Sequence, residues 1–344
     1  MRRTIALVSV LGLLFALTPL SGAGLIAAAP PVVGPRIGLV TDGGALGDLA
    51  FNQYAWAGVK DAAKAVHGSA EAIVPPANEP AYAWSIDRFA AHDFDVIVTV
   101  GFQMMQATLA GAARHPTIQF IGIDQGLDPG AIPTPNYQRL LFAEAQAGYL
   151  AGIVAATTSK TGVVGAVGGW DSIPPVLNFI NGYRNGAASV APGIIVKVDY
   201  AGDFSRPDLG ADAAHRLLAL GADVIFAVAG GSNLGVYGET CDDGLWAIGV
   251  DVDSALQAPA FKDCIVTSAE KRISTATALA IRRFAADGLQ GGEFFNDASN
   301  GGVGLSPLPR GKTPKGLDAT LKQALAGLAA GSINPCAPTA CDTK

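Results

Sequence analysis

Short apolar runs alternate with helical patterns along almost the whole chain, which is typical of α/β proteins. Because buried, non-alternating strands joined by helices form parallel sheets covered on both faces, we predict this fold class. Five segments carry apolar residues at helical spacing: Asn52–Val66, Ala143–Ala156, Val176–Val190, Asp208–Leu220 and Ser274–Asp287. Ten runs are predicted to be strands: Arg36–Val40, Ala72–Val74, Val96–Val100, Gln119–Ile123, Arg139–Phe142, Gly162–Val167, Ile194–Tyr200, Val224–Val228, Leu245–Val250 and Ile265–Ser268.

The pattern repeats, and ten strands are too many for one simple Rossmann-like unit. One series ends near Asp124 and a second begins near Tyr137. The Pro- and Gly-rich stretch between them, Gln125 to Asn136, is interpreted as a crossover between two lobes. We therefore predict an N-terminal lobe of residues 36–128 plus 270–290. Residues 129–269 plus 291–334 form the predicted C-terminal lobe, and residues 335–344 form a tail.

The first 29 residues differ from the rest. Arg2 and Arg3 precede an apolar stretch from Ile5 to Leu17, and small residues follow, which is typical of a secretory signal peptide over residues 1–29. The alternative is a retained membrane anchor, but the apolar run is short for a span. The first cysteine is Cys241, so lipid attachment to an N-terminal cysteine is not expected. We expect an exported protein of the periplasm or cell surface.

Charge and cysteine content narrow the function classes. The net charge of the 344 residues is −6 and no cluster of Lys and Arg occurs, so nucleic acid is not an expected partner. An even number of cysteines in an exported chain favours disulfides, with three connectivities open. Cys241 and Cys264 each precede a strand-like run, while Cys336 and Cys341 flank a short Pro-containing loop. We expect the pairs 241–264 and 336–341.

The residues that follow the predicted strands indicate a ligand-binding cleft. In parallel α/β sheets, ligands bind at the carboxyl ends of the strands. Aromatic side chains there stack on a flat ring, and carboxylates accept hydrogen bonds from hydroxyls, so we predict a flat polar ligand with hydroxyl groups. The positions are small, acidic, amide, aromatic or basic: Thr41–Gly44, Asp48, Phe51, Gly101–Gln103, Asp124, Gln125, Gly168–Trp170, Gly202–Phe204, Ala229–Asn233, Asp251, Asp253, Glu270 and Lys271.

Several motifs occur in an order that identifies a family resemblance. They are GLVTDGGALGDLAFNQYAWAGV (38–59), VGF (100–102), FIGID (120–124), AGYLAG (147–152), GDF (202–204), GADVIFAVAGGSNLGV (221–236), AIGVDVD (247–253) and TSAEKR (267–272). From about Arg36 to about Leu308, the chain resembles the basic membrane protein family, the PnrA-like substrate-binding proteins of ABC transporters. The resemblance implies a type I periplasmic-binding fold with two lobes, a hinge and a cleft. It also implies a purine nucleoside ligand, a permease partner, a monomer, and no cofactor or metal.

The resemblance also assigns residue roles. It implies that Phe51 and Phe204 stack on the two faces of the base, and that Asp251 accepts hydrogen bonds from the ribose hydroxyls. Asp42 matches the acid of the family's opening motif, and Lys271 matches a lysine that reaches the ligand. The other expected ligand-binding residues are Asn52, Gly101, Phe102, Gln106, Trp170, Gly230 and Gly231.

The chain departs from the family pattern within the same motifs. Gly47-Asp48 replaces a paired acid, and Leu49-Ala50 replaces Lys-Ser. Gln106 stands where the family has an Asp that contacts the base edge, and an amide donates as well as accepts. Trp170 stands where a smaller apolar residue is usual. These departures keep a flavin or another aromatic heterocycle open as the ligand. A role as a ligand sensor also stays open, because a sensor shares the fold.

An enzyme is the rival class. Nucleoside hydrolases also place clustered aspartates after a first strand, to hold calcium, which requires six to eight oxygen ligands. This turn has Asp42 and Asp48 without an adjacent acid pair, the four histidines are scattered, and no dinucleotide or P-loop motif occurs. We expect no enzymatic activity. Plainer interpretations also exist for single residues: Phe51 as helix core, Asp48 as a helix cap and Lys271 as a solvated charge at a helix start.

Overall fold

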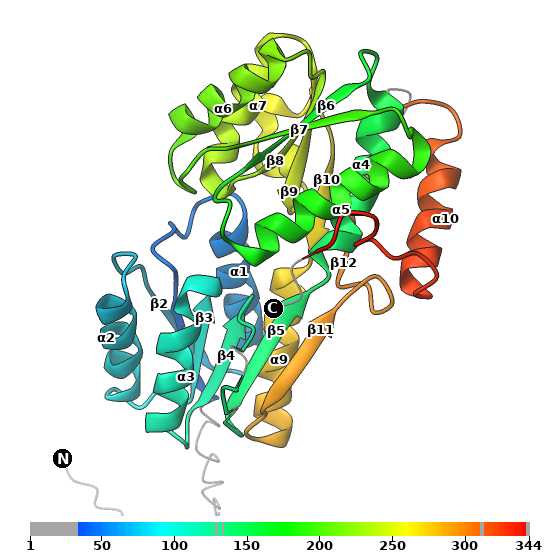
Figure 1. Ribbon diagram of the computed structural model, residues 1–344. Coiled ribbons are helices and arrows are strands. Elements are labelled where there is room, and N and C mark those ends of the chain that lie inside the picture. Colours follow the sequence, from blue (N-terminus) through cyan, green and yellow to red (C-terminus); the bar gives the residue numbers. More distant parts are fainter. Residues whose placement is uncertain (1–33, 128–129, 133, 310–312, 342–344) are drawn as a thin grey trace, which may run out of the picture. The chain divides into compact units, whose positions relative to one another are not determined.

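The structure is a computed structural model that describes residues 34–127, 130–132, 134–309 and 313–341, so the predicted signal peptide lies outside it. In this part of the chain, the strands form two six-stranded sheets (Figure 1). The first sheet has the order β11-β5-β4-β3-β1-β2 and the second the order β12-β10-β9-β8-β6-β7. The paired strands run parallel, except that β12 is antiparallel to β10. The predicted α/β class with two parallel-sheet lobes is confirmed.

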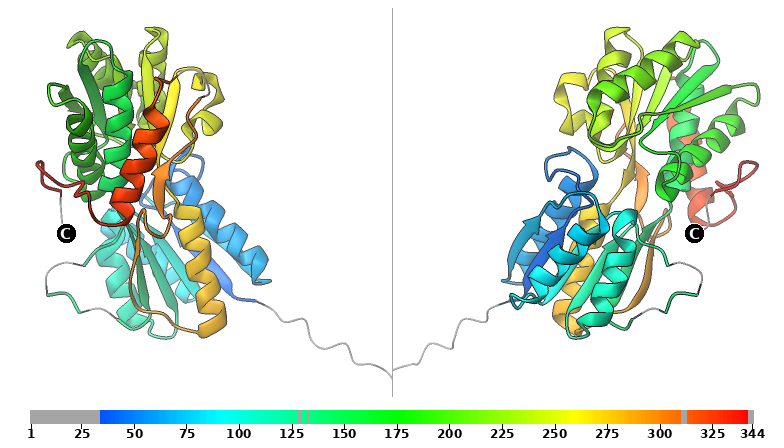
Figure 2. Two further views of the ribbon diagram at one scale, coloured as in Figure 1. Left: turned by 90° about the vertical axis from the view of Figure 1, so that its right-hand side faces the viewer. Right: turned by 60° about the vertical axis from the view of Figure 1, so that its left-hand side comes forward.

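The first lobe is built on β1 (Arg36–Val40), β2 (Ser69–Ile73), β3 (Val96–Val100), β4 (Gln119–Ile123), β5 (Tyr137–Phe142) and β11 (Gly292–Asn296). Its helices are α1 (Phe51–Ala65), α2 (Glu79–Ala90), α3 (Met105–Arg114) and α9 (Ile273–Asp287). Helices α1 and α9 pack together on one face of the sheet, and α2 and α3 pack on the other (Figure 2). Both faces of this sheet are therefore covered, which explains why its central strands are apolar without alternation.

The second lobe contains β6 (Val163–Gly168), β7 (Ile195–Tyr200), β8 (Val224–Val228), β9 (Trp246–Asp251), β10 (Ile265–Lys271) and β12 (Val303–Leu305). Its helices are α4 (Glu144–Thr158), α5 (Pro174–Val190), α6 (Pro207–Ala219), α7 (Asn233–Asp242), the short α8 (Ser254–Gln257) and α10 (Leu317–Ala329). Helices α4 and α5 approach very closely, because glycines face the other helix's backbone where a Cβ would clash: Gly148, Gly152, Gly182 and Gly186. This packing fixes α5, whose first turns reach the cavity described below.

The predicted lobe boundaries differ from the sheet pairing. The loop from Gln125 to Asn136 was expected to cross between lobes, but it joins β4 to β5, which pair in the same sheet. Strand β11, expected in the second lobe, pairs with β5 in the first. The chain instead passes between the lobes near residues 142–144, 271–273 and 296–303. The boundary was misplaced because Pro and Gly content identifies a loop, not the sheet that the next strand joins.

Both expected disulfides are present, Cys241–Cys264 and Cys336–Cys341. The first joins the last turn of α7 to the start of β10. The second closes a loop that Asn185 of α5 holds in place: its Nδ2 donates to the carbonyls of Pro335 and Thr339, both at 2.8 Å, and its Oδ1 accepts from the Thr339 N–H at 2.9 Å. Among the described residues, no helix combines the length and the apolar character needed to span a membrane.

Candidate ligand-binding site

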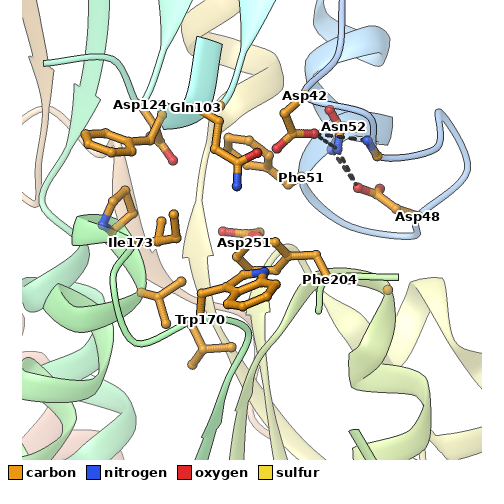
Figure 3. A pocket seen from close by; sticks show the side chains of 18 of the residues that line it. Asp42, Asp48, Phe51, Asn52, Gln103, Asp124, Trp170, Ile173, Phe204 and Asp251 are labelled. Carbon is orange, nitrogen blue, oxygen red and sulfur yellow. Dashed lines mark hydrogen bonds between the residues drawn. The ribbon is translucent and has the colours of Figure 1, made fainter. Parts of the chain in front are cut away.

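A cavity of about 410 Å³ lies between the carboxyl ends of the two sheets and is lined from both lobes (Figure 3). This is the edge at which the sequence predicts a cleft. Eleven of the twelve residues expected to bind ligand line it: Asp42, Phe51, Asn52, Gly101, Phe102, Trp170, Phe204, Gly230, Gly231, Asp251 and Lys271.

A polar network forms the wall at the start of α1. The carboxylate of Asp48 accepts hydrogen bonds from three backbone N–H groups of the first turn at 2.9–3.1 Å, so the residue caps the helix as the sequence suggests. Asn52 Nδ2 donates to Asp42 Oδ1 and to Asp48 Oδ2, each at 3.2 Å. These two bonds fix the orientation of the amide. The buried Oδ1 of Asn52 then has no partner within the described protein, which leaves an acceptor for a ligand.

Asp42 is fixed from several directions. Its Oδ1 also accepts from the Gly44 N–H at 3.1 Å, and its backbone carbonyl accepts from the Tyr82 hydroxyl at 2.8 Å. Burial raises the pKa of the Asp42 carboxyl, although the hydrogen bonds from Gly44 and Asn52 oppose the shift. Burial likewise raises the pKa of Tyr82 to about 12, with the nearby Asp42 charge as a second cause. The hydrogen bonds from Gly44, Asn52 and Tyr82 hold Asp42 in place at the cavity edge.

Aromatic side chains reach the cavity from both lobes. Phe51 is the first residue of α1, and Phe204 lies in the loop after β7 (Figure 3). The ring of Phe204 packs so closely on Gly169 that a Cβ there would overlap it. Trp170 is 42% exposed and adds a third ring. The first turns of α5 and the residue before it complete an apolar wall of Ile173, Pro175, Val176 and Phe179.

Lys271, the last residue of β10, joins parts of both lobes beneath the cavity. Its side chain is only 1% exposed, and its Nζ donates to Asp124 Oδ2 at 2.5 Å and to Glu144 Oε1 at 2.9 Å. The amine also lies 5.4 Å from the ring centre of Phe51 and 4.9 Å from that of Phe142. The interpretation of Lys271 as a solvated charge at a helix start is therefore wrong.

Two carboxyls pair directly with this amine, and the charge of Asp251 acts on it from farther away. Burial raises the pKa of Glu144 to about 7 and that of Asp251 to about 7, and the Lys271 charge opposes both shifts. Burial alone would lower the pKa of Lys271, but the attraction of Asp124, Glu144 and Asp251 outweighs it and raises that pKa. The ammonium thus occupies the centre of the acidic cluster. Within the described ranges, no group of three or more His, Cys, Asp or Glu side chains is arranged to hold a metal ion.

One predicted site residue is misplaced. Gln106 lies on α3 with its side chain exposed, and it does not line the cavity. Gln103, three residues earlier, does line it, because a 3₁₀ turn at Phe102–Met104 precedes α3 and directs Gln103 inwards (Figure 3). The predicted contact of residue 106 with a base edge therefore has no support from this cavity, whereas Gln103 lies at its wall.

Other lining residues were absent from the predicted site. Asp124, Asp203 and Ser205 contribute polar groups, and residues of α5 contribute apolar ones. Asp124 and Asp203 are among the strand-end positions that predict the cleft, but neither was assigned a contact with the ligand. The α5 residues carry no such signal, because Ile, Pro, Val and Phe at a helix start look like core.

The fold and the two-lobed cavity define a type I periplasmic binding protein. Residues 36–331 match the family model described as ABC transporter substrate-binding protein PnrA-like, and the chain belongs to this family. It is therefore the solute-binding component of an ABC transporter that acts outside the cytoplasm, and not an enzyme. A solute and a membrane permease are its partners by class.

Individual relatives are consistent with this family assignment. The chain is 31% identical over 288 residues to the CD4+ T-cell-stimulating antigen of Listeria monocytogenes, covering 78% of this chain and 79% of that protein. It is 30% identical over 229 residues to the ABC transporter nucleoside-binding protein BmpA of Lactococcus lactis, covering 63% and 64%. Among solved structures, a solute-binding protein of an ABC transporter system from Aeropyrum pernix is similar in fold. It has a TM-score of 0.77 at 24% identity, with 87% of this chain and 92% of that chain covered.

Proposed function

We propose that the cavity binds a purine nucleoside. The observation that carries the proposal is the meeting of Phe51 from one lobe and Phe204 from the other at a cavity that Asp251 also lines. A planar base fits between two rings, and a ribose supplies hydroxyl donors to a carboxylate. The relative from Lactococcus lactis, described as nucleoside-binding, supports the same ligand class.

The proposed roles follow the chemistry of each wall. Phe51 and Phe204 stack on the base, and Asp251 accepts hydrogen bonds from the ribose. The unpartnered Oδ1 of Asn52 accepts from an N–H of the base edge, beside Gln103 and Asp42. Gly101, Phe102, Gly230 and Gly231 bring backbone close to the ligand, Trp170 widens the aromatic surface, and Lys271 orders the carboxylates around it.

The charge of the cavity favours a nucleoside over a nucleotide. Five aspartates line it, and its one lysine is already paired with Asp124 and Glu144. A phosphate would add negative charge to this surface without a free cation within the described lining to receive it. An uncharged riboside avoids that repulsion.

The proposal includes export through residues 1–29 and delivery of the ligand, by a monomer, to the permease. It also includes an N-terminus without attached lipid. Mass spectrometry of the protein from its native membrane fraction tests the N-terminus: a diacylglyceryl adduct would contradict this part. Analytical ultracentrifugation tests the monomer.

The experiment that tests the ligand is calorimetric titration of residues 30–344. The protein is first unfolded and refolded without reductant, so that carried ligand is removed and both disulfides stay intact. The panel is adenosine, guanosine, inosine, uridine, adenine, ribose and riboflavin. We expect a purine riboside to bind more tightly than free base or ribose. If riboflavin binds and none of the nucleosides does, the fold assignment stands but the proposed ligand is wrong. If no compound of the panel binds, the proposal is overturned.

A variant separates the sugar from the base. Asp251→Ala should reduce the affinity for a riboside more than the affinity for the corresponding free base, because only the riboside has sugar hydroxyls that can donate to this carboxylate. Equal losses for both ligands would remove the ribose role of Asp251.

A further inference from the structure

We infer that Asp124 is a second acceptor for the sugar hydroxyls of the ligand, contributed by the N-terminal lobe opposite Asp251. The inference rests on the proposed function and deepens it. It starts from the internal symmetry of the fold. In the strand orders β11-β5-β4-β3-β1-β2 and β12-β10-β9-β8-β6-β7, β4 and β9 occupy the same position. Asp124 directly follows β4, and Asp251 is the last residue of β9.

The two aspartates share sequence and backbone conformation. Each ends an Ile-Gly-x-Asp segment, Ile121–Asp124 and Ile248–Asp251. Each has a positive φ, +60° for Asp124 and +66° for Asp251, a left-handed conformation that is uncommon for residues other than glycine. Such strained residues cluster at ligand sites, where the surrounding structure holds a side chain in a required place. Both side chains line the cavity (Figure 3).

The carboxylate of Asp124 has one oxygen used and one free. The side chain is 5% exposed, and its Oδ2 accepts from Lys271 Nζ. Its Oδ1 is buried and has no hydrogen-bond partner within the described protein. An ionised carboxylate can only accept, so the free oxygen requires a donor, and a sugar hydroxyl is the donor that a nucleoside offers at this point. Burial raises the pKa of Asp124, and the charge and hydrogen bond of Lys271 oppose that shift and orient the carboxylate.

The pair explains how sugar recognition couples to the two lobes. Asp124 follows a strand of the first lobe, and Asp251 belongs to a strand of the second. A ribose that donates hydrogen bonds to both carboxylates contacts both lobes, as the base does in the proposed stack between Phe51 and Phe204. A deoxyribose that lacks the hydroxyl facing Asp124 loses one of these contacts and leaves a buried acceptor unpaired, which weakens binding more than the loss of an exposed bond.

The test compares Asp124→Asn with the control Glu144→Gln. Both changes remove a carboxylate partner of Lys271, but Glu144 does not line the cavity. In Asp124→Asn, Lys271 needs an acceptor, so the amide oxygen turns to the lysine and its NH₂ faces the cavity. The ligands are the riboside that the wild type binds, its 2′-deoxy and 3′-deoxy forms, and the free base, measured by calorimetry after circular dichroism confirms the fold.

We expect the wild type to prefer the riboside to at least one deoxy form. Asp124→Asn should lose about tenfold or more in affinity for the riboside and most of this preference, with little change for the free base, while Glu144→Gln keeps the preference. An unchanged preference in Asp124→Asn would overturn the assignment and leave the proposed function standing. An equal loss in Glu144→Gln would also overturn it, because the effect would then come from the charge cluster. No riboside binding by the wild type would overturn the proposed function and this assignment together.

Discussion

Phe204 lies in the loop after β7, where its ring packs on Gly169, lines the cavity and is only partly buried against the core. We expect Phe204→Ala to reduce the binding free energy of any aromatic ligand by about 1–3 kcal/mol, by analogy with a base stacked on an aromatic side chain. Calorimetric dissociation constants check this. Phe295→Ala is the matched control, because Phe295 is 48% exposed on β11 and does not line the cavity. A dissociation constant unchanged from wild type would contradict the stacking role.

The buried carboxyl of Asp251 sets a pH dependence of stability. Burial raises its pKa from 3.8 to about 7, so the folded protein binds this proton more tightly than the unfolded chain does. The group therefore lowers the free energy of unfolding progressively as the pH rises from about 4 to about 7, and its full destabilising effect is present above that range. Asp251→Asn removes the titrating group. We expect it to raise the free energy of unfolding, relative to wild type, by on the order of 2 kcal/mol more at pH 8 than at pH 5.

Urea unfolding of the ligand-free protein at both pH values measures this difference. Asp212→Asn, a change at an exposed position of α6, should follow the wild type at each pH. Equal effects of Asp251→Asn at pH 5 and pH 8 would show that the carboxyl is not destabilised by burial. Together with weaker riboside binding, greater stability of this variant would mark Asp251 as a residue kept for binding at the expense of stability.

At this scale, the sequence predicts the residue type better than its exact position. The rule that strand ends carry the site, with the family resemblance, brings Asp42, Phe51, Phe204 and Asp251 to the cavity. The strand-end rule includes Gln103, which lines the cavity, whereas the family alignment selects Gln106, which does not, because a 3₁₀ turn before α3 directs Gln103 inwards. The 3₁₀ turn determines which glutamine of this segment points into the cavity, and no local sequence pattern signals that turn.

Secondary structure elements are predictable where burial on both faces makes a strand continuously apolar. The predicted bounds of β1, β3, β4 and β8 coincide with the observed ones, and the other six predicted strands differ at an end by one to three residues. Strands β11 and β12 were missed. Gly292–Asn296 alternates between half-buried and exposed positions at the edge of its sheet, with only Asn296 buried, and Val303–Leu305 has only three residues. Both depend on partners distant in sequence, β5 and β10, so the local pattern is weak.

Two helices from different lobes touch at the edge of the cleft. Gln53 Nε2 on α1 donates to Gln257 Oε1 on α8 at 3.1 Å, and Tyr54 also hydrogen-bonds Gln257. Because these bonds form only when the lobes are close, we expect Gln257→Ala to speed ligand dissociation several-fold and to change association little. Stopped-flow measurement of tryptophan fluorescence, with Trp170 in the cavity as reporter, gives both rates.

Leu256→Ala is the control for this pair, since Leu256 is the neighbouring residue of α8 and is 72% exposed. In a double-mutant cycle, Gln53→Ala and Gln257→Ala should be non-additive, because either change removes the same bond. Additive effects, or a dissociation rate equal to wild type in Gln257→Ala, would show that the contact does not hold the lobes together.

The arrangement of the whole molecule was the hardest level to predict. The existence of two parallel-sheet lobes follows from the number of strands and the repeat of the pattern. The assignment of β5 and β11 does not, because both join the first sheet through pairing with strands far along the chain. The crossings near residues 142–144, 271–273 and 296–303 also lack an unusual composition, although Lys271 lies at one of them. A hinge is set by which sheet accepts the next strand, and that choice is made by tertiary contacts.

We expect the lobes to separate about these three crossings when the ligand enters, which breaks the contact between Gln53 of α1 and Gln257 of α8. A covalent link between these two positions should then block exchange in both directions. We expect Gln53→Cys/Gln257→Cys, joined by a short bis-maleimide, to bind no ligand when linked empty. Linked with ligand present, it should retain the ligand through dialysis. The singly substituted proteins, treated in the same way, are the controls, and mass spectrometry confirms that the link spans the two positions. Normal ligand uptake by the protein linked empty would show that the ligand enters without separation of the lobes.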